Sequence, residues 1–270
     1  MDNDRRHAVP ADLPGWVDAR QSRGLYFFVR EEALSDLKMT EMAFRKSVSR
    51  LADKGRVVRI HSGFYCIIPL EYEASGLIPP EWFIDDLMAH IGQPYYVGLL
   101  SAAVLHGAGH QQPQQFQVVT TKALREIRTR RLSIRFFVKK RHSETKLSRI
   151  KAHTGYVAVS TPEATAIDLI RYARFLGGLD RVLTVLQELA ETMTAAGLVE
   201  AAVADGNVAF AQRLGWLLEK VGFSGLTEFT RWINKKKPFP TRLEPSLPAK
   251  GAILDSRWKL IINGSVEGDL

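Results

Sequence analysis

Basic residues at helical spacing are the first feature of this sequence that could do chemistry. Between Thr40 and Lys54, four apolar residues recur at i, i+4, i+7 and i+8, so they define one face of a helix. Basic side chains occupy the other faces, where they can contact base edges and neutralise phosphates. The run predicts a DNA-reading helix, and we expect five of its side chains to face the major groove: Thr40, Arg45, Lys46, Ser49 and Arg50.

A short hairpin follows this helix directly. Gly55 is suited to end the helix, and residues 56–60 and 64–68 have the composition of two strands joined by a three-residue turn. A helix followed by a basic two-stranded wing is typical of winged helix-turn-helix proteins. We expect Arg56, Arg59 and His61 to lie along the wing and its phosphates. A plain helix and hairpin with a solvated basic face is the alternative.

Residues 122–151 form a second basic segment, with twelve basic residues and two acids, a net charge of +10. Residues 1–80 carry only +1, so much of the net charge of +8 lies outside the predicted DNA reader. Three interpretations stay open: the segment neutralises DNA phosphates, contacts an acidic protein or an RNA, or is simply solvated. The candidate phosphate-binding residues are Lys122, Arg125, Arg128, Arg130, Arg131, Arg135, Lys139, Lys140 and Arg141. Residues 235–237 are a weaker basic run.

The remaining reactive side chains do not form a catalytic pattern. His106 and His110 are four residues apart, but the glycines between them break a helix, so a metal site is not expected. Cys66 lies in a predicted strand without a partner and is expected to be a buried core thiol. The acid pairs at 85–86 and 163/168 are expected to be mostly solvated helix positions. The sequence therefore predicts no enzyme, no metal and no cofactor.

The elements that position these residues indicate two domains in an α+β fold. Helices at 13–20 and 30–37 and a strand at 26–29 precede the DNA-reading helix. We expect a winged helix-turn-helix domain at residues 1–72, a linker at 73–80 and a larger mixed α+β domain at 81–270. In the second domain, strands are predicted at 117–121, 132–138, 155–159 and 258–263, and helices at 81–91, 161–170, 179–193, 196–204, 208–221 and 225–233.

Composition limits the class of protein. Hydrophobic residues make up 46% and charged residues 24%, as in ordinary globular proteins. One cysteine excludes an internal disulfide, and no apolar run approaches the ~20 residues of a membrane span. The N-terminal residues have no apolar stretch of the kind found in signal peptides. We therefore expect a cytoplasmic protein that does not bind membranes.

Three further motifs carry a resemblance that spans most of the chain. They are residues 100–107, LSAAVLHG, residues 159–169, VSTPEATAIDL, and residues 258–263, WKLIIN, with the acidic end that follows. Together with the predicted winged helix, the sequence resembles the AbiEi-type antitoxins, transcriptional regulators of bacterial type IV toxin–antitoxin systems. One departure is Ala164, where the family pattern has a basic residue after the glutamate.

The resemblance implies a function. Proteins of this kind bind inverted repeats in their own promoter, repress the operon and counteract a nucleotidyltransferase-like toxin, often without a stable complex. We therefore expect double-stranded operator DNA and such a toxin as partners; the oligomeric state is left open. Two alternatives remain: a nucleic-acid-processing enzyme, and a protein-interaction module with a basic surface.

Overall fold

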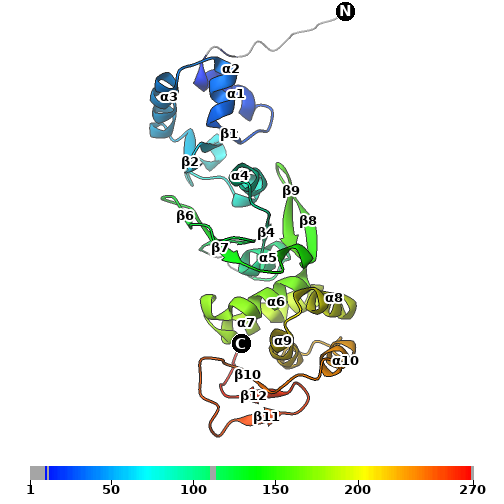
Figure 1. Ribbon diagram of the computed structural model, residues 1–270. Helices are drawn as coiled ribbons and strands as arrows, with labels where there is room; N and C mark the ends of the chain where they lie inside the picture. Colours follow the sequence, from blue (N-terminus) through cyan, green and yellow to red (C-terminus); the bar gives the residue numbers. More distant parts are fainter. Residues whose placement is uncertain (1–9, 11, 110–113, 269–270) are drawn as a thin grey trace, which may run out of the picture. The chain divides into compact units, whose positions relative to one another are not determined.

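The computed structural model describes residues 10, 12–109 and 114–268 (Figure 1). Its contacts divide the chain into two compact units. Unit 1 comprises Met1–Pro94, Arg125–Arg135 and Lys151–Val157, and unit 2 comprises Tyr95–Leu124, Phe136–Ile150 and Ala158–Leu270. These units group the chain differently from the predicted division at residues 73–80. That residues 1–72 form a domain of their own stays a prediction.

Unit 1 begins with three helices and a small sheet. In chain order these are α1 (Leu13–Gln21), β1 (Phe27–Val29), α2 (Arg30–Leu37), α3 (Glu41–Asp53), β2 (Val57–His61) and β3 (Phe64–Ile67). The three strands form an antiparallel sheet in the order β1-β3-β2. The short helices η1 (Leu70–Tyr72) and η2 (Pro80–Trp82) lead into α4 (Ile84–Ile91). The helices and strands predicted for this region are confirmed.

Local chemistry explains where these helices begin and end. Asp12 caps α1 by accepting a hydrogen bond from the backbone N–H of Gly15 at 2.9 Å, and Thr40 caps α3 through Ala43 at 3.2 Å. Gly55, with φ +69°, follows α3 and turns the chain into β2. The core between helices and sheet is apolar and buried. Its members are Leu13, Trp16, Val17, Phe28, Ala33, Phe44, Leu51, Val57 and Ile67.

A six-stranded sheet runs through the middle of the chain, in the order β6-β7-β5-β4-β9-β8. Its strands are β4 (Tyr95–Val97), β5 (Phe116–Thr120), β6 (Ile127–Arg128), β7 (Ser133–Val138), β8 (Leu147–Ala152) and β9 (Gly155–Ser160). Most of its residues belong to unit 2, whereas β6 and the turn ends of the two hairpins belong to unit 1. Strands β5, β7 and β9 confirm predictions; β6 and β8 were not predicted.

Helix α6 (Pro162–Tyr172) is the centre of unit 2, and every residue from Glu163 to Ile170 is buried. It packs against α5 (Leu99–Leu105), α7 (Leu179–Leu189), α8 (Ala195–Asp205) and α9 (Val208–Lys220). Thr161 caps it, and the proline at its first position fits the first turn. The predicted helix positions are therefore confirmed. The prediction that its two acids are solvated is wrong: Glu163 is 6% exposed and Asp168 0%.

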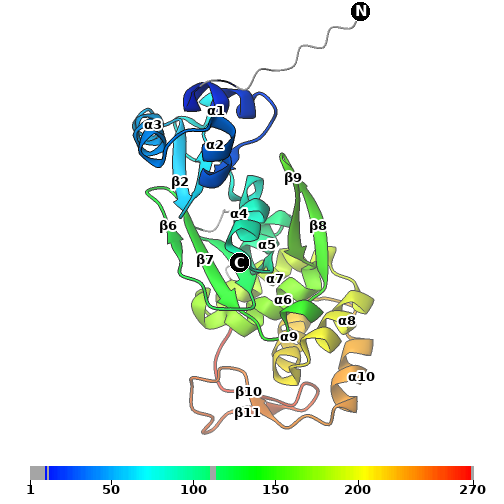
Figure 2. The ribbon, with the colours of Figure 1, turned by 45° about the horizontal axis from the view of Figure 1, so that its top comes forward.

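A small sheet closes unit 2 after α10 (Thr227–Lys235). Its strands β10 (Thr241–Arg242), β11 (Ile253–Asp255) and β12 (Leu260–Ile262) have the order β10-β12-β11. Trp258 anchors it, because this fully buried ring lies directly against Gly215 of α9. Strand β12 confirms the strand predicted at the end of the chain. Figure 2 shows the same ribbon from a second direction. The fold is thus mixed α+β, as predicted.

Candidate nucleic-acid interface

The outer face of α3 is polar and exposed. Successive helix residues are about 100° apart, so Met42, Lys46 and Ser49 lie together, opposite the buried side chains of Phe44 and Leu51. Arg45 and Arg50 flank this strip, and both are exposed. The structure therefore brings four of the five predicted helix residues onto one accessible face. Thr40, the fifth, lies at the N-cap, where its hydroxyl accepts the N–H of Ala43.

Met42 is a residue on this face that the sequence reasoning missed. It is 68% exposed although it is large and apolar. An exposed apolar side chain beside basic groups is suited to contact a thymine methyl group in the major groove. Its helical spacing from Lys46 and Ser49, at i, i+4 and i+7, could have identified it.

Acidic residues hold two arginines beside the start of α3. Glu41 accepts a hydrogen bond from Arg45 Nε at 3.0 Å, and Arg30 lies 3.6 Å from the same carboxylate. Arg30 also donates to Glu31, and this hydrogen bond lowers the pKa of the Glu31 carboxyl. Arg45 remains 73% exposed in its side chain, so its guanidinium is still accessible to a ligand.

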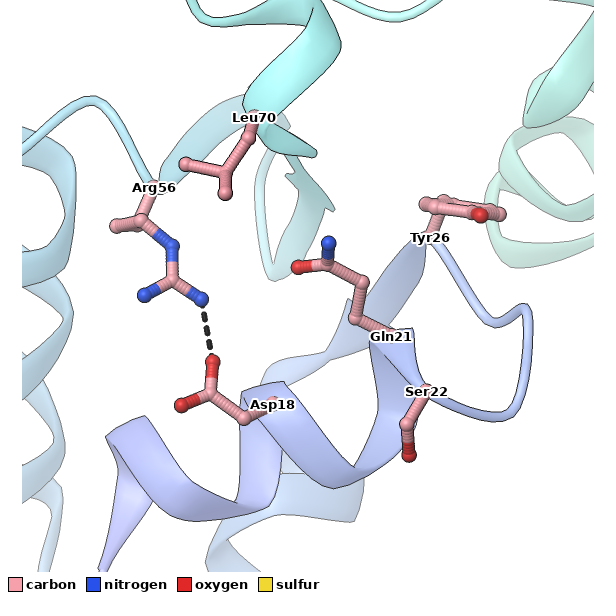
Figure 3. A pocket seen from close by; sticks show the side chains of 6 residues that line it. All are labelled: Asp18, Gln21, Ser22, Tyr26, Arg56 and Leu70. Carbon is pink, nitrogen blue, oxygen red and sulfur yellow. Dashed lines mark hydrogen bonds and ion pairs between the residues drawn. The ribbon is translucent and has the colours of Figure 1, made fainter.

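The predicted wing residues have three different environments. Arg59 is exposed, and its Nε donates to the backbone oxygen of His61 at 3.3 Å. Arg56 forms an ion pair with Asp18 of α1 beside a pocket of about 340 Å³. Figure 3 shows this pair with the other lining side chains, Gln21, Ser22, Tyr26 and Leu70. Arg56 is thus already neutralised by a carboxylate, whereas Arg59 has none among the described residues.

The turn of the β2–β3 hairpin packs against α4. His90 Nε2 lies 2.8 Å from the backbone oxygen of Ser62, and the His61 and His90 rings are 5.9 Å apart. A Cβ atom on Gly63 would lie 3.6 Å from both His90 and Glu31. His61 is half-buried, and its Nδ1 has no hydrogen-bond partner in the part of the chain that the structure describes. Its ring faces a helix of the same unit.

A second hairpin, β6–β7, contributes basic residues to unit 1. Its strand β6 contacts β2, and Figures 1 and 2 both show the two strands close together. Arg125, Arg128, Arg130 and Arg131 are exposed on it. Arg128 is paired with Glu126 at 2.8 Å, and Arg135 is half-buried. That these residues bind phosphate stays a prediction, and the sequence could not show that they join the unit that contains α3.

The rest of the predicted phosphate-binding patch lies in unit 2. Lys122, Lys140 and Arg141 are exposed there, and Arg141 is paired with Glu144. Lys139 is the exception, because it is only 3% exposed. Its ammonium lies 2.8 Å from Asp168 and 3.5 Å from Asp205. The prediction that Lys139 belongs to a phosphate-binding surface is therefore wrong: the side chain points into the core.

Lys139 belongs to a buried polar cluster in unit 2 that the sequence did not reveal. Asp168 accepts hydrogen bonds from Lys139 and, at 2.7 Å, from the hydroxyl of Tyr96, while Arg171 pairs with Asp205 at 2.5 Å. Burial, together with the Asp168 charge, raises the pKa of Tyr96 far above its ordinary value. The sequence gives only two signals of this cluster. Lys139 directly follows a predicted strand, and Asp168 lies within the apolar stripe of a predicted helix.

His142 packs beside this cluster. Its ring lies 4.9 Å from that of Tyr96, and its Nε2 is buried without a hydrogen-bond partner among the described residues. Burial lowers the pKa of His142, which favours the neutral ring. The cluster thus combines a neutral imidazole with charges that are mutually compensated, an arrangement that fixes β7 and α6 relative to each other within unit 2.

The histidine and cysteine side chains considered for metal binding or nucleophilic chemistry have structural roles where the structure describes them. His106 Nε2 lies 2.6 Å from the backbone oxygen of Ser160, whereas His110 lies outside the described residues. Cys66 is buried, and burial raises its pKa. Within residues 12–109 and 114–268 we find no group of three histidine, cysteine or acidic residues placed to hold a metal. No helix of the described chain is both long and apolar enough to span a bilayer.

Comparison with known proteins gives a family match and similarity to a solved structure. Residues 96–220 match the family model of the AbiEi antitoxin C-terminal domain. No curated protein has a significantly similar sequence. The crystal structure of the RV2827C protein from Mycobacterium tuberculosis is similar over 94% of each chain, with a TM-score of 0.66 and 16% sequence identity. At that identity the likeness concerns the fold, whereas the family match confirms the resemblance within residues 96–220, which include the motifs at 100–107 and 159–169.

Proposed function

We propose that this chain, which belongs to the AbiEi antitoxin family through residues 96–220, represses its own toxin–antitoxin operon. The observation that carries the DNA-binding part is the outer face of α3. Arg45, Lys46, Ser49 and Arg50 are exposed there on a rigid helix, capped at Thr40 and held by a buried apolar face. Such a face presents donors for base edges and charges for phosphates without needing to reorganise.

The order of elements in unit 1 supports a winged helix-turn-helix domain. Helices α2 and α3 are separated by a short turn, and α3 leads into the antiparallel β2–β3 hairpin, which also pairs with β1. In domains of this kind the second helix of the pair enters the major groove. We therefore assign α3 as the recognition helix. Arg45 and Arg50 are the side chains suited to bidentate contact with guanine.

The exposed basic residues around α3 would add affinity without specificity. Arg59 on β2 and the arginines of the β6–β7 hairpin belong to the same unit as α3. Each phosphate that they neutralise releases counterions, which steepens the dependence of binding on salt by roughly one unit in a log–log plot. Lys122, Lys140 and Arg141 of unit 2 are further candidates for phosphate contact, whereas Lys139 is not, because it is buried.

The antitoxin domain supplies the second half of the proposal. The matched residues 96–220 include the buried cluster around Asp168 and most of the helices of unit 2. We propose that this domain counteracts a nucleotidyltransferase-like toxin encoded beside this chain, and that the DNA recognised by α3 is an inverted repeat in the shared promoter. Reading of the operator by α3 and neutralisation of the toxin by residues 96–220 would then reside in different parts of one chain.

Two measurements test the proposal. Full-length protein is titrated against its own promoter fragment and against unrelated DNA of equal length and base composition. The toxin, if a neighbouring reading frame encodes one, is expressed with and without this chain, and growth is followed. We expect tighter binding to the promoter, protection of an inverted repeat, and restored growth on co-expression.

The opposite outcomes are equally clear. Equal affinity for both fragments would contradict sequence-specific repression, and growth arrest that persists on co-expression would contradict the antitoxin role. Metal-dependent cleavage of either fragment by the purified protein would favour a nucleic-acid-processing enzyme. Stable capture of a protein partner with no DNA binding would favour an interaction module.

A further inference from the structure

The turn of the β2–β3 hairpin, which would serve as the wing tip, is tethered to α4, although Ser62 at its apex is exposed. Ser62 is held by His90 at 2.8 Å, the His61 ring faces the His90 ring, and Gly63 lies against both His90 and Glu31. A winged helix-turn-helix protein uses its hairpin turn to contact DNA beside the recognition helix. Because His90 ties this turn to α4, the turn cannot move freely toward DNA, and a second basic element beside β2 would extend the contact.

The β6–β7 hairpin lies where such an element is needed. Strand β6 contacts β2, and both belong to unit 1. In Figures 1 and 2 alike, α3, β2 and β6 follow one another along the same edge of unit 1. A chain segment remote in sequence thus adds a second basic hairpin beside the strand that follows the recognition helix.

This hairpin has a rigid turn. The N–H of Thr129 donates to the backbone oxygen of Leu132 at 2.8 Å, and the Thr129 hydroxyl accepts the N–H of Leu132 at 3.1 Å. The apolar side chains at its base, Ile127, Leu132 and Ile134, are buried at 8%, 6% and 0% exposure. The turn therefore loses little conformational entropy when it binds a ligand.

Three arginines of the hairpin, Arg128, Arg130 and Arg131, differ in what they contact. Arg131 donates to the backbone oxygen of Ala74 and lies beside Gly76, so it anchors the turn to the segment before α4. Arg128 is paired with Glu126. Arg130, at the apex, is exposed and has no hydrogen-bond or ion-pair partner among the described residues. One guanidinium is thus presented by a turn that its neighbours hold in place.

We propose that the β6–β7 hairpin acts as a second wing beside the tethered β2–β3 turn, and that Arg130 enters the DNA minor groove next to the site of α3. This inference rests on the proposed function. A single guanidinium on a narrow turn fits the minor groove, which is only about 6 Å wide. Narrow A·T-rich minor grooves concentrate negative potential and attract inserted arginine side chains. The ligand class is therefore A·T-rich duplex flanking the half-site that α3 reads.

The test uses three synthetic duplexes that share the promoter half-site and differ only in the flanking base pairs. These pairs are A·T, G·C or inosine·C. Inosine lacks the amino group that guanine places in the minor groove, so inosine·C resembles A·T in that groove and G·C in the major groove. We expect full-length protein to bind the A·T and inosine·C duplexes about tenfold more tightly than the G·C duplex.

Arg130→Ala should bind all three duplexes equally, at the level of the G·C duplex, and Arg130→Lys should recover only part of the preference. Arg125→Ala is the matched control, since it removes an exposed arginine near the base of the same hairpin. It should weaken the three duplexes alike and keep their order. Circular dichroism melts establish that each variant is folded.

Two results would overturn the inference. One is an Arg130→Ala protein that keeps the wild-type preference among the duplexes; the other is a wild-type protein that groups inosine·C with G·C. Neither result affects the proposed function as long as wild-type protein prefers the promoter half-site over a scrambled half-site. Loss of that preference would refute the proposed function itself, whatever Arg130 does.

Discussion

Replacing Lys139 by alanine should destabilise unit 2 strongly, because it removes the cation between two buried carboxylates. Asp168 and Asp205 have side chains only 0% and 2% exposed, and Lys139 lies 2.8 and 3.5 Å from them. Breaking a buried ion pair costs about 3–5 kcal/mol. Arg171, 2.5 Å from Asp205 and 3.8 Å from Asp168, compensates in part, so we expect about 3 kcal/mol.

A loss of this size corresponds to a fall in Tm of about 6–12 °C for a unit of this size. Thermal and urea unfolding of the full-length protein measure it. Lys139→Met, which keeps the aliphatic stem, should lose nearly as much, because both carboxylates still lack the ammonium. Lys140→Ala is the control; this neighbour is exposed and should change stability by less than about 0.5 kcal/mol. If Lys139→Met is as stable as wild type, the buried charge is not what the cluster depends on.

Two other predictions concern stability. Gly215→Ala places a Cβ atom 2.1 Å from a ring carbon of the fully buried Trp258. The free energy of unfolding should therefore fall by about 1–3 kcal/mol. Ala196→Ser, at an exposed position, is the control and should leave Tm unchanged. Burial, aided by Asp85, raises the pKa of Asp86 from 3.8 to about 6. Its folded state therefore holds a proton that the unfolded state has released, and stability falls as pH rises through the window from 3.8 to about 6. Asp86→Asn should melt higher than wild type at pH 7.5 and like wild type near pH 4; a constant difference would contradict this reasoning.

Local signals predicted most elements of the fold. The apolar spacing of Phe44, Val48 and Leu51, the cap at Thr40 and the glycine at 55 fix α3 within a few residues, because these interactions lie within one stretch of chain. The strands β6 and β10 were not predicted because each has only two residues. Two residues are too few to show the alternation of a strand, whether the partner is the neighbouring β7, as for β6, or the later β12, as for β10.

The parts of the site that the sequence did not reveal depend on long-range packing. Lys139 lies in a sequence segment whose basic composition is typical of a protein surface. Its partners, Asp168 and Asp205, come from two later helices, so the segment itself does not indicate that Lys139 is buried. The tethering of the β2–β3 turn depends on His90 of α4, whose position no local pattern indicates. In the same way, charge counting found the arginines at 125–135 but not their membership of unit 1.

The most direct test of the account is a titration of promoter DNA with four full-length proteins: wild type, Arg45→Ala, Arg50→Ala and Lys140→Ala. If α3 is the recognition helix, loss of a bidentate contact to guanine should cost about 1–3 kcal/mol and relax specificity at one base pair. Lys140→Ala should instead weaken every sequence alike and reduce the salt dependence. If Arg45→Ala and Arg50→Ala both bind the promoter as wild type does, α3 does not read the DNA.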